Sequence, residues 1–333
     1  MSIPLHPPGT PLVATCHAKV NLHLRIVARR PDGYHDLETL FCSVSLADRL
    51  RIEPIAPGDA PPGGVALRLD GPACSPALEA EDSTRNLAVR AYLLARQEIN
   101  RRHGLPAGAT PPGWPAAVRL HLHKRIPVGA GLAGGSADAA GALHAAAAWA
   151  GGLLSLDDLT TLAAQLGSDI PFCIRGGLAL GRGRGELLTH LAPPAPPELY
   201  LLLVHPPFAI STAEAYRSCH PEGPDPEGSL DQFVRKLSTP GVRMDLDLVS
   251  GLLHNTFYQW HLPGFGDLEA LAQGLVKVGA RAVLLSGSGP TLMGFFASRS
   301  ASLEAQAQLA ADGVACQPVE PVPHGVLVQA DEA

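Results

Sequence analysis

The sequence lacks the features that mark most zinc-binding, secreted and membrane proteins. Its 333 residues include only six cysteines, with no Cys-x-x-Cys pair, so neither a zinc site nor a dense disulfide framework is indicated. No His-Glu-x-x-His motif accompanies the 14 histidines. No apolar run has the length of a membrane span, and the N-terminus lacks the basic and apolar regions of a secretion signal. We therefore expect a cytoplasmic protein that binds no membrane.

Charge is sparse and mixed in sign. The chain has 25 Lys and Arg against 31 Asp and Glu, a formal net charge of -6, and the basic residues form no stripe. This composition disfavours nucleic acid as a partner. The length suffices for two domains, and the proline-rich segment 192–197 is the best candidate for a linker. We therefore expect domains over residues 1–190 and 191–333.

Glycine, in contrast, is concentrated in residues 124–140. Gly129, Gly131, Gly134 and Gly135 let the backbone adopt positive φ and approach a ligand closely. An alanine-rich run of high helix propensity follows them. Free N–H groups and the positive end of a helix dipole would then converge on one point, which suits a phosphate. The alternative is a glycine-rich turn that only caps a buried helix.

Two other phosphate-binding loops fit this stretch less well. The glycines formally match the dinucleotide fingerprint G-x-G-x-x-G, which should follow a strand buried on both faces. Residues 118–124 instead alternate apolar and polar, which predicts a half-exposed antiparallel strand, and Pro127 interrupts the approach to the turn. The Walker form G-x-x-x-x-G-K-[ST] is absent from the sequence. A Rossmann enzyme and a P-loop ATPase are both disfavoured.

Two pairs of polar residues near the N-terminus could meet a ligand. Residues 13–26 alternate in polarity, which predicts a strand with Lys19 and Asn21 on the same face. A Pro-Asp-Gly turn then precedes Tyr34 and His35. The alternative interpretation is a solvated strand face followed by ordinary half-buried aromatic residues.

Three later segments carry further candidate features. Asp169 lies in a short element after a predicted helix that Gly167 ends. Residues 176–185 are glycine-rich and could approach a ligand or only turn the chain. Residues 286–290 form a second tight glycine turn between two predicted strands.

Three motifs together resemble those of the GHMP kinase family, the small-molecule kinases named for galactose, homoserine, mevalonate and phosphomevalonate. The motifs are Ala-Lys-Val-Asn-Leu at residues 18–22, the glycine-rich segment 127–137, and Leu-Ser-Gly-Ser-Gly-Pro-Thr at residues 285–291. Their order and spacing agree with the family, so the resemblance covers nearly the whole chain. It implies an α+β fold, with an N-terminal domain resembling ribosomal protein S5 domain 2 and a ferredoxin-like C-terminal domain.

Within the family, residues 31–41, Pro-Asp-Gly-Tyr-His-Asp-Leu-Glu-Thr-Leu-Phe, resemble one branch in particular. That branch uses ATP to phosphorylate the 2-hydroxyl of 4-diphosphocytidyl-2-C-methyl-D-erythritol in the non-mevalonate route to isoprenoids. Residues 166–172 are similar to its catalytic-aspartate segment. Kinases of the homoserine or mevalonate type remain alternatives, as does a catalytically inactive GHMP fold that acts as a regulator. Both a monomer and a homodimer remain open.

For the nucleotide end, the resemblance implies that ATP phosphates bind the glycine-rich loop and that Mg²⁺ accompanies them. Ser136 is the candidate magnesium ligand, although several GHMP kinases carry two serines where this loop has Gly135 before a single Ser136. Asn86 is a candidate for the adenine side or, equally, a helix cap. The loop residues assigned to ATP are Pro127, Val128, Gly129, Ala130, Gly131, Leu132, Ala133, Gly134, Gly135, Ser136 and Ala137.

For the acceptor end, the resemblance implies that Asp169 is the general base and Lys19 its electrostatic partner. A cytosine ring needs aromatic faces for stacking and fixed polar groups for its edge. Tyr34 and Tyr216 would supply the two faces, and His35 would read the edge. The remaining residues assigned to the acceptor are Asn21 and Thr212.

Overall fold

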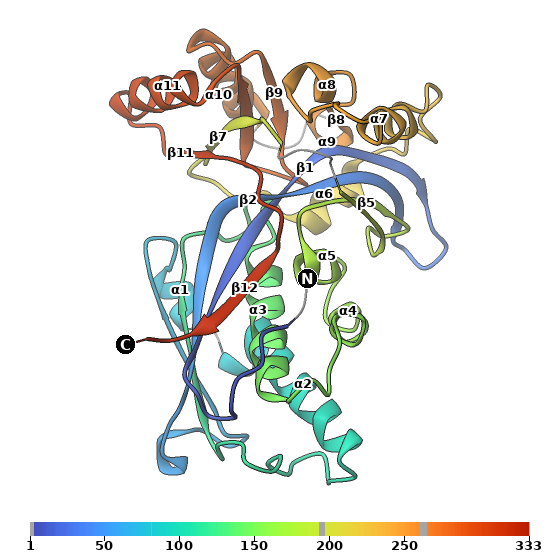
Figure 1. The fold of residues 1–333 in the computed structure, drawn as a ribbon. Helices are drawn as coiled ribbons and strands as arrows, with labels where there is room; N and C mark the ends of the chain where they lie inside the picture. Colours follow the sequence, from blue (N-terminus) through green and yellow to red (C-terminus); the bar gives the residue numbers. More distant parts are fainter. Residues whose placement is uncertain (1–2, 81, 193–196, 260–264, 333) are drawn as a thin grey trace.

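The structure is a computed structural model that describes residues 3–80, 82–192, 197–259 and 265–332. Most of the predicted linker, residues 192–197, lies outside these described residues. The chain forms two sheets with helices packed against them (Figure 1). Within the ranges given, no helix is both long and apolar enough to cross a membrane.

The first sheet is built on two long antiparallel strands, β1 (Leu12–Arg29) and β2 (His35–Pro54). They are joined by the predicted turn and extend from one part of the molecule to the other (Figure 1). The sheet order is β12-β1-β2-β4-β3, with β5 on β2, β6 on β5, and β8 on β1. The remaining strands are β3 (Val65–Asp70), β4 (Val118–His123), β5 (Leu178–Arg182), β6 (Leu187–Leu191), β8 (His254–Asn255) and β12 (Val326–Ala330).

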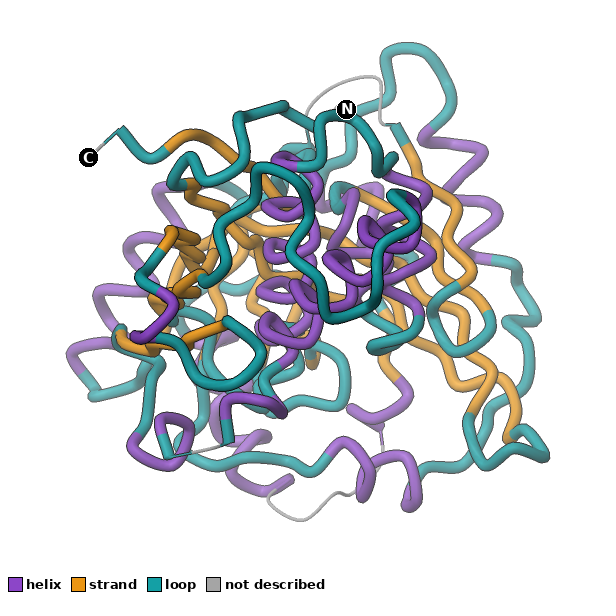
Figure 2. The backbone as a smooth tube through the Cα atoms, turned by 90° about the horizontal axis from the view of Figure 1, so that it is seen from below, coloured by secondary structure: helices purple, strands orange, loops and turns teal. Residues whose placement is uncertain are grey.

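One face of this sheet is covered by helices, of which α3 (Gly134–Trp149) is the most buried. Its alanines and glycines allow a close approach, because a Cβ at Gly141 would lie only 2.4 Å from Sγ of Cys16 on β1. Seen from below, the helices stand against the strands (Figure 2). The other helices of this part are α1 (Pro76–Glu79), α2 (Leu87–Arg102), α4 (Leu156–Ala164) and α5 (Ile170–Arg175).

The second sheet is antiparallel and has the order β11-β7-β10-β9. Its strands are β7 (Tyr200–Val204), β9 (Ala282–Leu285), β10 (Leu292–Phe296) and β11 (Cys316–Val319). Two long helices, α10 (Phe265–Lys277) and α11 (Arg299–Ala311), pack against it. The shorter helices are α6 (Thr212–Ser218), α7 (Ser229–Leu237), α8 (Leu246–Ser250) and α9 (Thr256–Gln259).

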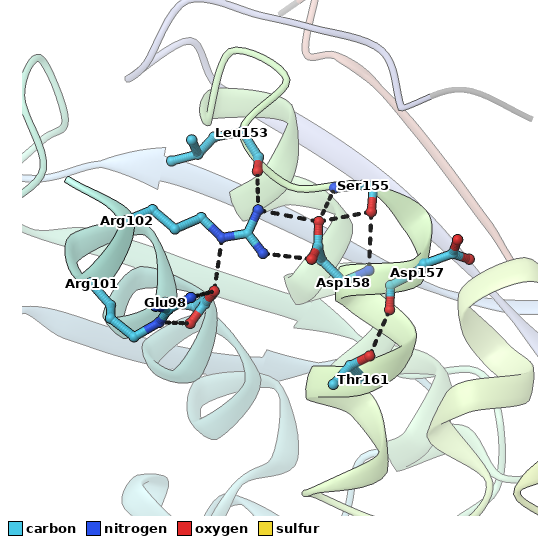
Figure 3. A network of polar contacts seen from close by, with 8 residues as sticks. All are labelled: Glu98, Arg101, Arg102, Leu153, Ser155, Asp157, Asp158 and Thr161. Atoms are coloured by element: carbon cyan, nitrogen blue, oxygen red, sulfur yellow. Dashed lines mark hydrogen bonds and ion pairs between the residues drawn. The ribbon is translucent and has the colours of Figure 1, made fainter.

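A network of charged residues joins α2 to α4 (Figure 3). Arg102, at the C-terminal end of α2, contacts Glu98 on its own helix and Asp158 in the first turn of α4. Asp158 also forms a capping box with Ser155. The cation thus lies at a helix C-terminus and the carboxylate at a helix N-terminus, where each is favoured by the helix dipole.

His144 on α3 connects the core to α5 and generates a testable pH dependence. Its Nε2–H donates to the carbonyl of Ile174 at 2.9 Å, and burial lowers the pKa of His144 to about 4. A folded-state pKa below the unfolded value gives stability that is present above about pH 6.5 and is lost as the pH falls through 4.

We therefore expect His144→Gln to reduce the loss of unfolding free energy between pH 6.5 and 4 by up to about 3 kcal/mol. Urea denaturation at a series of pH values measures this difference. The exposed His103, which follows α2, provides the control His103→Gln. An unchanged pH slope in the His144 variant would contradict the prediction.

Candidate active site

A cavity of about 900 Å³ lies where the two sheets meet the glycine-rich loop. Its walls come from β1, the start of β2, the loop before α3, the N-terminus of α5, α6 and the β9–β10 turn. The predicted site residues that line it are Lys19, Asn21, Tyr34, His35, Asn86, Pro127, Val128, Gly129, Ala130, Gly131, Ala133, Gly134, Gly135, Ser136, Asp169, Thr212 and Tyr216. Leu132 and Ala137 do not line it, because both are buried in the core.

The glycine-rich loop leads directly into α3, as the sequence predicts. Gly129 and Gly131 have positive φ, and so does Ala133, the residue before the helix. The first turn of α3 presents N–H groups that have no partner within the helix. Gly134, Gly135 and Ser136 of this turn line the cavity, so an anion there would meet the N-terminal end of the helix dipole.

Gly131 is the point at which the loop touches the third motif. Its carbonyl oxygen accepts hydrogen bonds from Nζ of Lys19 at 3.0 Å and from Oγ of Ser286 at 3.1 Å. A Cβ at Gly131 would lie 2.1 Å from the carbonyl oxygen of Ser286. Glycine is therefore required at this position by contact with the chain itself, in addition to any contact with a ligand.

Lys19 is a buried cation in the cavity wall. Its ammonium is buried, donates to Oδ1 of Asn21 at 2.8 Å and lies 3.7 Å from Oδ2 of Asp169. Asp169 precedes α5, but its side chain makes no capping hydrogen bond there. Its carboxylate is thus directed by Lys19 and is 39% exposed at the cavity, which leaves it accessible to a substrate proton.

Three aromatic residues, from β2, α6 and α9, form a cluster at the cavity. The ring of His35 lies 5.3 Å from that of Tyr216, which in turn packs edge-on against Phe257. Burial, together with the nearby Arg29, lowers the pKa of His35, so its imidazole favours the neutral form. Burial and the charge of Asp169 raise the pKa of the Tyr216 hydroxyl.

Hydrogen bonds fix the two smaller polar residues predicted for the acceptor. Nδ2 of Asn21 donates to the hydroxyl of Thr39 at 2.8 Å. Thr212 on α6 shares a hydrogen bond of 3.0 Å with Ser288 of the β9–β10 turn. This contact brings α6 and the third motif to the same side of the cavity.

A cluster of buried charged residues holds the two ends of the glycine-rich loop. The sequence did not predict this cluster. Asp48 on β2 accepts the backbone N–H groups of Arg125 and Ile126 and pairs with Lys124. Lys124 also contacts Asp138 on α3 at 2.5 Å. Burial raises the pKa of Asp138 to about 7. Burial alone would lower the pKa of Lys124, but the two carboxylates beside it raise that pKa above its ordinary value. A single charge within an alanine-rich helix was the sequence signal for this cluster.

Apolar residues beside the loop were also missed, because they come from three separate elements. Leu69, Leu78 and Leu87 line the cavity together with Val128 of the predicted loop. Asn86 caps α2, its Oδ1 accepting the N–H of Ala88 at 2.9 Å. The residues that line the cavity but were not predicted are Leu24, Arg29, Gly33, Leu37, Phe41, Leu69, Leu78, Leu87, Lys124, Ile126, Asp138, Ser168, Arg184, Ala213, Arg217, Gly287 and Ser288.

Gly135 offers a test of phosphate binding that leaves the fold intact. A Cβ there would come no closer than 3.6 Å to the Leu87 side chain, and alanine is a better helix former than glycine. We expect Gly135→Ala to keep its melting temperature and to weaken ATP binding roughly tenfold, because the added methyl group at the cavity wall would move the phosphate away from a backbone N–H and cost about one hydrogen bond. Calorimetric titration with ATP measures this effect. Gly251→Ala is the control, because a Cβ at Gly251 would meet no atom of the described residues within 4 Å. Unchanged ATP affinity would remove Gly135 from the phosphate site.

Comparisons with known proteins agree with this geometry. A family model described as GHMP kinases N terminal domain matches residues 86–177. A protein of Pelotomaculum thermopropionicum named 4-diphosphocytidyl-2-C-methyl-D-erythritol kinase is 39% identical over 301 residues, which cover 90% of this chain and 93% of the relative. One of Geobacillus kaustophilus with the same name is 36% identical over 83% of this chain and 85% of the relative.

Solved structures show the same relationship. A crystal structure of 4-(cytidine 5'-diphospho)-2C-methyl-D-erythritol kinase matches with a TM-score of 0.65 and 32% identity, covering 93% of this chain and 98% of that one. Homoserine kinase from Cytophaga hutchinsonii matches with a TM-score of 0.67 at 18% identity, covering 96% and 98%, which shows a shared fold. The predicted two-domain α+β GHMP kinase fold is confirmed. The chain belongs to the 4-diphosphocytidyl-2-C-methyl-D-erythritol kinase family, a branch of the GHMP kinases.

Proposed function

We propose that this protein uses ATP to phosphorylate the 2-hydroxyl of 4-diphosphocytidyl-2-C-methyl-D-erythritol, a step in the non-mevalonate route to isoprenoid precursors. The observation that carries the proposal is one cavity that holds the glycine-rich loop, the Lys19–Asp169 pair and an aromatic cluster. The names of the relatives support the same activity. The presence of Lys19 and Asp169 together favours an enzyme over an inactive regulator.

In the proposed reaction the loop and the first turn of α3 bind the ATP phosphates through backbone N–H groups. Lys19 attracts the oxygens of the γ-phosphate, which accumulate charge during transfer. A bond forms between the acceptor oxygen and the γ-phosphorus while the bond to the β–γ bridging oxygen breaks, so ADP leaves. The hydroxyl proton passes to the carboxylate of Asp169.

We further propose that Mg²⁺ accompanies ATP and that Ser136 contributes a ligand. Within the described ranges, no group of three or more His, Cys, Asp or Glu side chains could hold a metal by itself. Magnesium does not require such a group, because it is commonly held by one or two protein oxygens together with nucleotide phosphates. Ser136 lies in the first turn of α3 on the cavity wall. When bound, the ion neutralises phosphate charge.

At the acceptor end we propose that cytosine stacks between Tyr34 and Tyr216 and that His35 reads its polar edge. All three line the cavity, and the neutral imidazole favoured by burial can both donate and accept a hydrogen bond. Asn21 and Thr212 would contact the remainder of the substrate. Both are held by the side-chain hydrogen bonds described above.

The proposal extends to the organisation of the chain. We assign residues 1–190 to the ATP-binding domain and 191–333 to the C-terminal domain, with β12 returning to pair with β1. The substrates are small intracellular metabolites, so we place the protein in the cytoplasm. Its mixed charge and formal net charge of -6 favour no nucleic acid partner.

A kinase assay with four acceptors tests the proposed substrate directly. We expect phosphorylation of 4-diphosphocytidyl-2-C-methyl-D-erythritol in the presence of ATP and magnesium, and none of homoserine, mevalonate or galactose. Phosphate transfer to one of the last three, with none to the cytidyl compound, would refute the substrate assignment and retain a kinase.

Asp169→Asn tests the assigned base. We expect kcat to fall by about 10²–10⁴-fold, the usual contribution of general base catalysis, with little change in ATP affinity. Asp312→Asn, an exposed position following α11, is the matched control. Near-normal turnover of the Asp169 variant would exclude the carboxylate from proton transfer.

A further inference from the structure

The glycine-rich turn between β5 and β6 lies against the acceptor end of the cavity. Strand β5 pairs with β2, and beyond the pairing the N–H of Leu37 donates to the carbonyl of Gly183 at 2.6 Å. The turn therefore contacts the chain two residues after His35. Gly183 and Gly185 both have positive φ, and a Cβ at Gly185 would lie 3.4 Å from the ring of Phe41. These glycines allow the turn to pack closely on β2.

Between the two glycines, Arg184 points its side chain at the ring of Tyr34. The guanidinium carbon lies 4.9 Å from the ring centroid, within the range of a cation–π contact. Glu186 also holds the arginine, because its carboxylate accepts the backbone N–H of Arg184 at 2.6 Å and lies 3.5 Å from Nε of the side chain. The side chain of Arg184 is 34% exposed, and both Arg184 and Tyr34 line the cavity.

The contact between Arg184 and Tyr34 restricts a ring that is otherwise free to rotate. Tyr34 follows a turn and is 54% exposed, so it lacks the packing that holds Tyr216 against Phe257. An exposed ring can rotate, and ordering it on binding would cost affinity. A guanidinium over the ring restricts its rotation, while the exposed surface of Tyr34 remains available for a base. Its positive charge also favours an anionic ligand at this end of the cavity.

We propose that Arg184 is a specificity-determining residue of the acceptor site: it holds Tyr34 ready to stack and attracts a nucleoside diphosphate. This inference rests on the proposed function, because the nucleoside diphosphate is part of the proposed acceptor. Arg184 has no assigned part in binding ATP, since its contacts are with Tyr34 and Glu186. Its loss should therefore affect the two substrates differently.

The test compares Arg184→Met, Arg184→Lys and the wild type. Methionine retains much of the aliphatic length without charge or a planar cation, whereas lysine keeps the charge. Arg182→Met is the matched control, because Arg182 ends β5, its side chain forms an exposed ion pair with Asp231, and it is not among the residues that line the cavity. Cytidine 5'-diphosphate, titrated calorimetrically with a non-hydrolysable ATP analogue filling the other nucleotide site, reports acceptor-site binding. Steady-state assays then give KM for the acceptor and for ATP.

We expect Arg184→Met to raise the Kd of cytidine 5'-diphosphate and the acceptor KM about tenfold, with the ATP KM and melting temperature unchanged. Arg184→Lys should recover part of the affinity, and Arg182→Met should match the wild type. Unchanged cytidine 5'-diphosphate binding in Arg184→Met, or an equal rise in the ATP KM, would overturn the inference. Failure of the wild type to phosphorylate the cytidyl acceptor would instead refute the proposed function, so the two failures are distinguishable.

Discussion

The carbonyl oxygen of Gly131 is the point on which the rest of the site depends. It accepts hydrogen bonds from Lys19 and from Ser286, so one backbone atom joins the first strand, the glycine-rich loop and the third motif. The contact is possible only without a side chain, because a Cβ would overlap the carbonyl of Ser286. Lys19 is held by this contact and by Asn21, within ion-pair distance of Asp169. The same bond thus places a cation between the glycine-rich loop and the carboxylate of Asp169.

A cluster of buried charged residues stabilises the glycine-rich loop. Asp48 holds the backbone just before the loop, and Lys124 connects it to Asp138 in the first turns of α3. Both ends of the loop are therefore tied to the same ammonium. Removing one partner of a buried ion pair typically costs about 3–5 kcal/mol, because the other charge is left unpaired. The cluster fixes the loop through electrostatics, while the glycines within the loop remain open to a ligand.

Sequence patterns predicted the elements that local residues determine. They did not predict the elements that depend on contacts with residues distant in the sequence. The local sequence of residues 212–218 predicts a short helix, and the structure confirms it as α6. The apolar spacing of residues 246–258 predicts one continuous helix, which is wrong. The structure has α8, β8 and α9 there, because Asn255 donates to the carbonyls of Leu285 and Gly287 and β8 pairs with β1. The final strand, β12, was missed, since its pairing with β1 is specified across the whole chain. Arg184 was passed over for a similar reason: its partner Tyr34 lies far away in sequence.

A double-mutant cycle on Lys19 and Asp169 tests most directly the central claim that the two act as one unit. The kcat values of Lys19→Met, Asp169→Asn and the double variant would be measured at saturating ATP and acceptor, with melting temperatures to confirm folding. Residues that serve the same transfer step lose function together, so we expect the double variant to be about as slow as the poorer single variant. A double variant whose loss equals the product of the two single losses would show that Lys19 and Asp169 act independently.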